Sequence, residues 1–371
     1  MSKILTMSQT LGLLALTAPA LAQTSVVPSS ASNTEAISRG RIAGFSERSR
    51  MQVLYSSLAL SSLGQKEITA IWFRRDQIFG HSYQSSTSSI TVSVSAAQRF
   101  TTNASQAFAD NRGPTPSIVF DGLIDLPANS SPPQPAPWDS IYAVRIPFSN
   151  PFPYFGSDLC VEIEGEPLTA PPGFYWSVDY EHEAPAGIVT SFGPACSAIT
   201  ANIERTAHGW GRNVVPGATF STTSWGQPLT PCTLLLGSRL TTPIPLDSMG
   251  ASGCELLVQP AIQINQSYSD VTALGPFGIV KFDVHLPAVS SLLSARFARQ
   301  WVNLEIGSAT SNPARLTTTN GLDYTVAAGL PAGTLTTILS DAVPPATPFP
   351  ATGRVSVSRG PVTRFDYRDP Q

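Results

Sequence analysis

A stretch of strict alternation constrains the fold of this chain more than any other feature. Between Ser89 and Ser95, the apolar residues Ile90, Val92 and Val94 alternate with serine and threonine. Successive side chains of a β-strand point to opposite faces, so this pattern predicts a strand with one buried and one polar face. Such strands are typical of antiparallel sheets.

The composition favours many short strands over long helices. Charged residues make up only 13% of the chain, while glycine and proline together number 60 (27 plus 33). Turn formers in this number suit strands joined by exposed loops, and few charges remain for the solvated faces of helices. We expect one short helix, between Gln98 and Asp110.

The strand signals fall into two groups. The first group lies before residue 190 and contains Met51–Leu60, Ile68–Phe73, Ser89–Ser95, Ser117–Leu126, Ile141–Ile146, Leu159–Ile163 and Phe174–Tyr180. The second contains Thr219–Ser224, Cys232–Leu236, Glu255–Val258, Ile279–Val284, Phe297–Leu304 and Leu322–Val326. These counts predict two consecutive antiparallel β-sandwich domains of the jelly-roll or immunoglobulin-like kind.

The expected domain organisation follows from these groups. Residues 1–22 are predicted as a signal peptide, and 23–44, which lack hydrophobic periodicity, as a linker. The first sandwich spans 45–190, with its junction to the second between residues 181 and 195. The second spans 191–329, and 330–371 are predicted as a proline-rich tail, in which Gly353–Ser358 could add one edge strand.

The first residues resemble an export signal. Lys3 precedes an apolar run from Leu11 to Leu16, and Ala20-Leu21-Ala22 fits a signal-peptidase site. The run is too short for a transmembrane helix, and no later segment is long enough to span a bilayer. We therefore expect a secreted protein, located outside the cell, at its surface or in a periplasm.

Four cysteines, Cys160, Cys196, Cys232 and Cys254, follow the predicted cleavage site. In an oxidising compartment an even number favours disulfides, and three connectivities are open at this point. A zinc site is disfavoured because no C-x₂-C pair occurs and no histidine lies at ligand spacing.

Six short segments follow one another in the second half: Phe192–Cys196, Pro216–Phe220, Leu234–Gly237, Pro245–Asp247, Gly253–Cys254 and Gln300–Trp301. In this order they resemble a C-terminal β-sandwich module of secreted planctomycete-type proteins. Through Ile68–Arg75 and Phe174–Trp176, the first half resembles the domain that often precedes that module. Cys232 departs from the pattern, since the module has a plain apolar residue there. The resemblance implies an architecture and an exported location, and it implies no activity.

The resemblance also implies a disulfide pairing. Cys196 and Cys254 match the module's recurring cysteines, and each lies beside a glycine-containing turn. We therefore expect a Cys196–Cys254 bond. Cys160 and Cys232 would then bridge the domains or remain thiols. Thiols are favoured because Cys232 begins an apolar strand, and free cysteine behaves as a small buried hydrophobe.

Two groups of carboxylates are candidates for chemistry. Asp179, Glu181 and Glu183 occupy every second position, with His182 between the last two. On one face of a strand, their carboxylate oxygens could hold calcium. The alternative interpretation is that these residues form a solvated strand end and hairpin loop. A second group, which also alternates, could serve glycoside hydrolysis or line a water-facing surface; its members are Glu162, Glu164 and Glu166.

Aromatic residues offer a third candidate site. Phe174, Trp176 and Tyr180 are expected on one strand face, where stacked rings could bind sugars. The competing interpretation places them in the core, because such side chains bury large apolar areas.

No catalytic, cofactor or metal motif is present, and no basic patch indicates a nucleic-acid partner. We expect an exported, non-catalytic structural or adhesive protein, whose partners are extracellular polysaccharide or cell-surface proteins. Two alternatives stay open. One is a carbohydrate-binding module that uses the three aromatics, and the other is an extracellular hydrolase whose catalytic residues the sequence does not identify.

Overall fold

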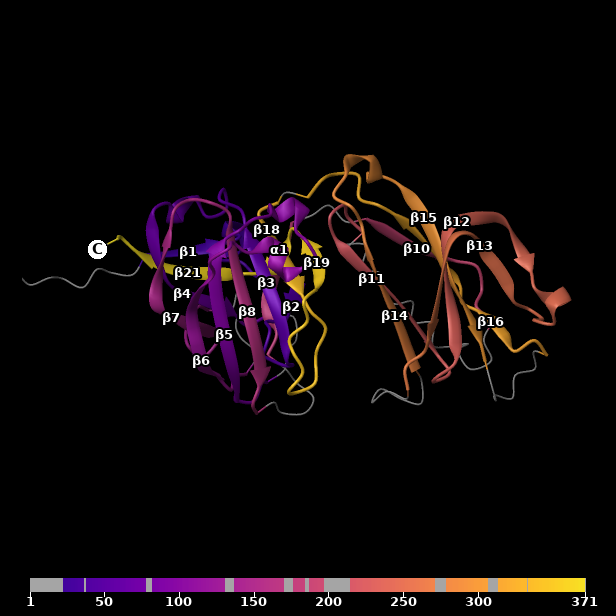
Figure 1. Cartoon of the computed structure of the whole chain (residues 1–371), viewed down its shortest axis with the longest axis horizontal. Helices are drawn as coiled ribbons and strands as arrows, with labels where there is room; N and C mark the ends of the chain where they lie inside the picture. The colour runs from indigo at the N-terminus through magenta and orange to yellow at the C-terminus, as the bar shows by residue number, and fades with distance from the viewer. Residues whose placement is uncertain are drawn as a thin grey trace, which may run out of the picture.

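Antiparallel strands form nearly all of the regular structure, which confirms the all-β prediction. The computed structural model describes residues 23–36, 38–77, 82–130, 137–169, 176–183, 187–196, 214–270, 278–305, 313–331 and 333–370. Within these residues the single α-helix is α1 (Phe108–Asn111), which overlaps the end of the stretch Gln98–Asp110 where a helix was expected. The strands gather in two lobes, seen side by side in Figure 1.

The first lobe contains three sheets, with the strand orders β1-β21-β4-β7, β19-β18-β3-β8-β5-β6 and β2-β9-β20. Its strands are β1 (Gln23–Val27), β2 (Ser38–Gly40), β3 (Ser49–Tyr55), β4 (Lys66–Arg74), β5 (Ser86–Ala96), β6 (Ser117–Leu126), β7 (Ala143–Tyr154), β8 (Leu159–Pro167), β9 (Val178–His182), β18 (Leu335–Leu339), β19 (Arg354–Val357), β20 (Arg359–Pro361) and β21 (Thr363–Arg368).

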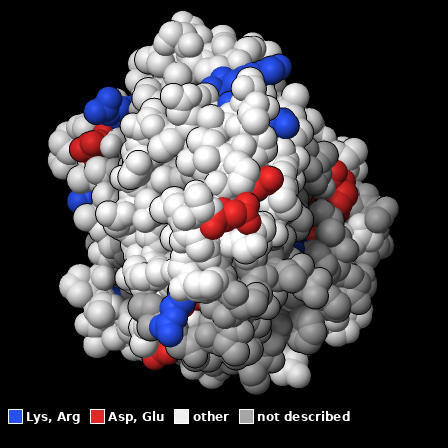
Figure 2. Space-filling model, turned by 90° about the vertical axis from the view of Figure 1, so that its right-hand side faces the viewer, with Lys and Arg blue, Asp and Glu red and all other residues white. Residues whose placement is uncertain are grey.

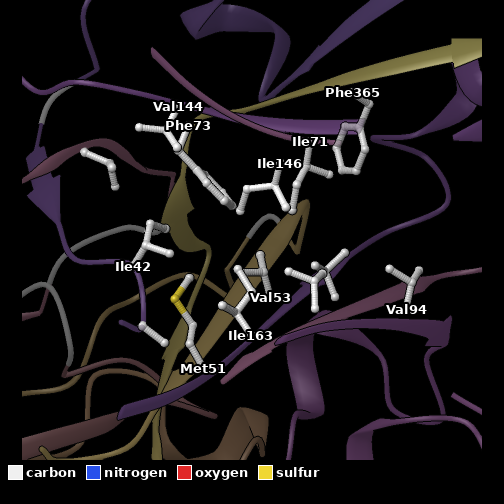
Figure 3. Close-up of a cluster of buried hydrophobic side chains, with 14 of the residues drawn as sticks. Ile42, Met51, Val53, Ile71, Phe73, Val94, Val144, Ile146, Ile163 and Phe365 are labelled. Atoms are coloured by element: carbon white, nitrogen blue, oxygen red, sulfur yellow. The ribbon is translucent and has the colours of Figure 1, made fainter. Parts of the chain in front are cut away.

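The two larger sheets of this lobe enclose the main core. Ile90, Val92 and Val94 on β5 are buried, as their alternation predicts. Figure 3 shows side chains of one sheet (Ile71, Phe73, Val144, Ile146 and Phe365) facing those of the other (Met51, Val53, Val94 and Ile163). Burying a side chain of this size stabilises a fold by roughly 1.5–3 kcal/mol, so the facing layers hold the sandwich together.

The end of the chain belongs to this core, and the prediction of a proline-rich tail over 330–371 is wrong. Within it, the edge strand expected at Gly353–Ser358 is present as β19. β21 lies between β1 and β4, and β18 lies between β19 and β3. In Figure 1 the yellow C-terminal strand runs among the indigo and purple ones. The prolines at 344–350 fall in the connection between β18 and β19. Strands of three to six residues are too short to reveal a period, which explains the error.

The segment 23–44, predicted as a linker, also contributes strands. β1 pairs with β21 along its whole length, and β2 pairs with β9. Ala31 and Ala36 pack with Val362 in a small buried cluster. Both ends of the described chain therefore pair with strands that are distant in sequence. A local sequence pattern cannot predict such pairing.

The second lobe contains a larger sheet of order β10-β17-β15-β12-β13, in which β16 also pairs with β15, and a two-stranded sheet of β11 and β14. The strands are β10 (Ile188–Phe192), β11 (Thr219–Gly226), β12 (Pro231–Pro245), β13 (Glu255–Ser267), β14 (Gly278–His285), β15 (Arg296–Leu304), β16 (Leu316–Thr318) and β17 (Gly321–Thr325). Phe220, Phe297 and Tyr324 pack their rings together between the two sheets.

The two lobes are not consecutive in the chain. β9 and β10 lie in different sheets, so the chain leaves the first lobe within the predicted junction interval. It then returns to the first lobe at β18, which makes the second lobe an insertion between β9 and β18. This corrects the expectation of one sandwich after the other, and the cause is the same long-range pairing of the C-terminal strands.

A small cluster joins the lobes. Val215 and Ala218 from the second lobe pack with Leu54, Phe108 and Cys160 from the first. In addition, the backbone N–H of Val355 and the side-chain amide of Gln106 donate to Oγ1 of Thr219, at 3.2 and 3.3 Å. Apolar contact and hydrogen bonds thus connect β11 to β19.

Candidate functional site

The predicted disulfide is present and fastens the start of β13. Cys196 follows β10, Cys254 immediately precedes β13, and the two residues are bonded with their Cα atoms 5.0 Å apart. Cys254 lies in a buried cluster with Leu246 and Ala251, against which Cys196 packs. The bond therefore ties one end of β13 to the chain beyond β10.

The other two cysteines are free thiols, as the sequence favoured. Cys160 is buried on β8 and Cys232 is buried on β12, in different lobes. Burial raises the pKa of both thiols, that of Cys232 to about 12. Since the thiolate is the reactive form of cysteine, neither side chain is suited to nucleophilic chemistry.

The aromatic candidate site does not form a surface. Trp176 and Tyr180 are buried in the core of the first lobe, and Phe174 lies outside the described residues. Trp176 donates from Nε1 to the carbonyl oxygen of Pro127 at 3.1 Å, and the Tyr180 hydroxyl donates to that of Arg41 at 3.0 Å. Rings held in this way cannot stack on a sugar from solvent, so these two residues do not support the carbohydrate-binding alternative.

The acidic group around His182 does not converge on one point. Asp179 is buried and forms an ion pair with Arg74, while the Glu181 carboxylate accepts from the backbone N–H of His182 at 2.8 Å. Glu183 lies apart, beside a pocket. Within the described ranges, no three His, Cys, Asp or Glu side chains come together as a metal site requires.

The second group of carboxylates is neutralised by arginine. Glu162 pairs with Arg50 at 2.8 Å, and Glu166 pairs with Arg48 at 2.9 Å. Glu164 also pairs with Arg50, at 3.2 Å. Glycoside hydrolysis needs a carboxyl group facing a second one across the substrate, whereas each of these glutamates faces a guanidinium. We therefore interpret these ion pairs as structural. Glu162 is also buried, so it does not line a water-facing surface.

The outer edge of β13 is the strongest candidate site in the part of the chain that the structure describes. β13 is the last strand of its sheet and pairs with β12 on its inner side. It is 13 residues long, and the segment Leu256–Ser267 contains no charged residue. Its exposed side chains include Gln259, Gln263 and Asn265. An edge strand presents a row of backbone N–H and C=O groups that can pair with another chain.

The other long edges of the four- and six-stranded sheets are blunted, and β13 differs from them. β6 exposes Asp121 and Asp125, and β7 contains Pro147, Pro151 and Pro153, which cannot donate to a partner strand. The edges β1, β10 and β19 of the larger sheets have five residues or fewer. In the two-stranded sheet, β14 contains Lys281 and Asp283, whereas β11 is uncharged but only eight residues long. Charges, prolines and short length are the usual protections against edge-to-edge pairing. β13 has one proline, Pro260, at a register shift, and otherwise lacks them.

The surroundings of β13 are also poor in charge. Figure 2 shows the end of the molecule formed by the second lobe, where a few separated charged side chains lie on a mostly uncharged surface. Ile244 on β12, Met249 after it and Ile262 on β13 are exposed. A partner approaching this end therefore meets little charge that must be desolvated.

The sequence identified only the first third of this strand. Glu255–Val258 was predicted, whereas β13 continues to Ser267. The missed signal is the alternation of Ile262 and Ile264 with Gln263 and Asn265, which is broken upstream by Pro260. Gly237 on β12 pairs with Pro260 at the register shift, and a Cβ there would overlap the carbonyl oxygen of Gln259, so the shift requires glycine at this position.

Comparisons with known proteins assign no family. No family model matches the chain, and no curated protein matches it. The infectious bursal disease virus VP2 subviral particle is 12% identical over 94% of this chain and 80% of that chain, with a TM-score of 0.17. The T13 particle of the same virus is 10% identical over 94% and 77%, also with a TM-score of 0.17. Scores this low carry no argument about fold or function.

Proposed function

We propose that this chain is an exported, non-catalytic structural or adhesive protein whose copies associate through the outer edge of β13. The observation that carries the proposal is the long, uncharged strand at that edge. Two copies of one strand can pair in antiparallel fashion about a two-fold axis, so the same surface serves both partners. Backbone hydrogen bonds supply the affinity, as in other cases where a strand is added to a sheet edge.

The side chains along β13 suit such pairing. Gln263 and Asn265 are exposed amides, and amides of paired strands can hydrogen-bond with one another. The Asn265 side chain already accepts from Oγ1 of Thr233 on β12, at 2.9 Å. Ile262 adds an exposed apolar group in the middle of the strand. A second copy would bury this group and extend the amide row.

The proposed location outside the cytoplasm rests on two features. The first is the predicted leader over 1–22, which lies outside the described residues. The second is the Cys196–Cys254 disulfide, since such bonds persist in oxidising compartments. No helix in the described ranges has the length and hydropathy to cross a membrane. A surface that associates with its own copies fits a structural or adhesive component there.

Lysine on the edge of β13 is expected to prevent self-association. In the variant Ala261→Lys, Gln263→Lys, like charges meet across a two-fold pairing and weaken it by about tenfold or more. Sedimentation velocity of residues 23–371 over a range of concentrations should show a shift towards dimer or larger species, and the variant should remain monomeric.

The matched control places the same charges on another edge. Ser117→Lys, Leu123→Lys introduces two lysines at exposed positions of β6 and should associate like the unmodified protein. If the unmodified protein stays monomeric at every concentration, or if the β13 variant associates as strongly as it does, the proposed function is wrong.

A further inference from the structure

A pocket of about 470 Å³ lies in the first lobe, and no residue of β13 lines it. Ser25 on β1, Ser29 on η1 (Ser29–Ala31) and Ser62 on η2 (Ser61–Leu63) line one part of it. Glu183, just after β9, and Thr334, just before β18, line another. Its volume lies in the range of pockets that hold small molecules. None of the functions considered above uses it.

The lining is rich in hydroxyl groups and contains a single charged residue. Five serines and one threonine surround Glu183, together with apolar side chains such as Leu58. Oε2 of Glu183 and Oγ1 of Thr334 are shielded from solvent, and neither has a hydrogen-bond partner in the described part of the chain. Buried polar groups are normally hydrogen-bonded, so these two oxygens beside one pocket are suited to accept hydrogen bonds from a bound ligand.

The electrostatics of the pocket favour a cation. Burial and the neighbouring Glu181 carboxylate raise the pKa of Glu183 to about 7, and no basic residue lines the pocket. Above that pH the fold holds a partly desolvated negative charge without a counter-charge at the site, which is unfavourable. A bound cation would offset this cost, and it would do so through charge-assisted hydrogen bonds.

We propose that this pocket binds a small hydroxylated molecule that carries a primary ammonium group. Glu183 and Thr334 accept hydrogen bonds from the ammonium, and the serine hydroxyls pair with the hydroxyls of the ligand. Serine both donates and accepts, so the serines around the pocket match hydroxyls of either orientation. A neutral polyol would leave the Glu183 charge uncompensated and is therefore the weaker ligand.

The proposal is tested with two probes that differ only in the charged group. D-glucamine carries an ammonium where D-sorbitol carries a hydroxyl, and an alkyl ammonium remains protonated at about pH 8 as lysine does. Calorimetric titration at that pH should show glucamine binding about tenfold or more tighter than sorbitol, the difference expected for a hydrogen bond to a charged group. Glu183→Gln should abolish this preference.

Glu181→Gln is the matched control. It makes the same chemical change two residues away, at a side chain that does not line the pocket, and should keep the preference for glucamine. If glucamine and sorbitol bind equally, if neither binds, or if Glu183→Gln keeps the preference, the proposal is overturned.

A pH series on the unmodified protein gives a second test that needs no variant. In the folded state the pKa of Glu183 is raised from its ordinary value of 4.5 to about 7, so between these pH values the folded protein binds more protons than the unfolded chain does. The contribution of Glu183 to the free energy of unfolding is therefore fully present below about pH 4.5, and it is lost as the pH rises through about 7. Glucamine binds the ionised form, so it should raise the melting temperature at about pH 8 and not at about pH 5.5. Equal shifts at both pH values would contradict a site built on the Glu183 charge.

Discussion

Replacing Phe365 by alanine is expected to lower the free energy of unfolding of the first lobe by about 3–5 kcal/mol. Phe365 is fully buried on β21, the strand that lies between β1 and β4. Its ring meets that of Tyr55 edge-on, with the ring centroids 5.2 Å apart. The variant removes a large side chain from the centre of a packed sandwich and leaves a cavity there. Urea unfolding monitored by tryptophan fluorescence would measure the loss.

Phe349→Ala is the matched control for Phe365. Phe349 lies in the connection between β18 and β19, where its ring is covered by the guanidinium of Arg48 at 4.0 Å. It is only partly buried, so its loss should cost about 1 kcal/mol or less. Both residues fall within 330–371. Equal and small effects of the two variants would mean that this segment is peripheral, contrary to the observed strand order.

The double variant Cys196→Ser, Cys254→Ser is expected to destabilise the second lobe by about 4 kcal/mol. The bonded cysteines are 58 residues apart, and closing a loop of that length restricts the unfolded chain by about this amount in the entropy model. A typical domain has a stability of only about 5–15 kcal/mol, so the loss should lower the melting temperature sharply. Calorimetric unfolding of the oxidised protein and of the variant gives the difference.

Cys160→Ser controls for the loss of a buried sulfur without the loss of a bond. Cys160 is a buried free thiol in the first lobe, and its replacement should cost about 1 kcal/mol, the usual effect of a point substitution. Non-reducing peptide mapping should recover Cys196 linked to Cys254. A map that pairs Cys196 with Cys160 or Cys232, or a double variant as stable as the unmodified protein, would contradict this role of the disulfide.

Local patterns predicted the features that depend on a few neighbouring residues. The alternation of Ile90, Val92 and Val94 predicted β5, and an apolar run predicted β4. The Cys196–Cys254 bond followed from glycine-containing turns and a resemblance to a secreted module. In each case the deciding property, such as period 2 or a turn residue, lies within one short segment.

Long-range pairing was not predicted, because the partners lie far apart in the chain. β1 pairs with β21 across more than three hundred residues, and the sequence of neither strand indicates which strand is its partner. The burial of Asp179 was missed for the same reason. Its ion pair with Arg74 and the hydrogen bond from the backbone N–H of Ala36 bring together three separate segments. From the local sequence alone, Asp179 is expected to be solvated because Glu181 and His182 lie close to it in the chain. Its burial becomes apparent only when the three segments are placed together in the fold.

The edge of β13 shows a different limit. Local sequence can indicate a strand, but it cannot show that the strand lies last in its sheet. That position depends on β12 pairing with both β13 and β15. The absence of charge over Leu256–Ser267 is visible in the sequence, and it gains meaning only once the edge is known.

Hydrogen–deuterium exchange of Leu256–Ser267 tests the proposed self-association most directly. In an isolated molecule the outward backbone amides of an edge strand exchange rapidly, because they have no partner strand. Pairing with a second copy gives these amides hydrogen bonds. Their exchange should therefore slow as the concentration rises, and it should stay fast in the variant Ala261→Lys, Gln263→Lys. Exchange over this segment that is independent of concentration, while the protein associates through another surface, would contradict the proposed role of β13.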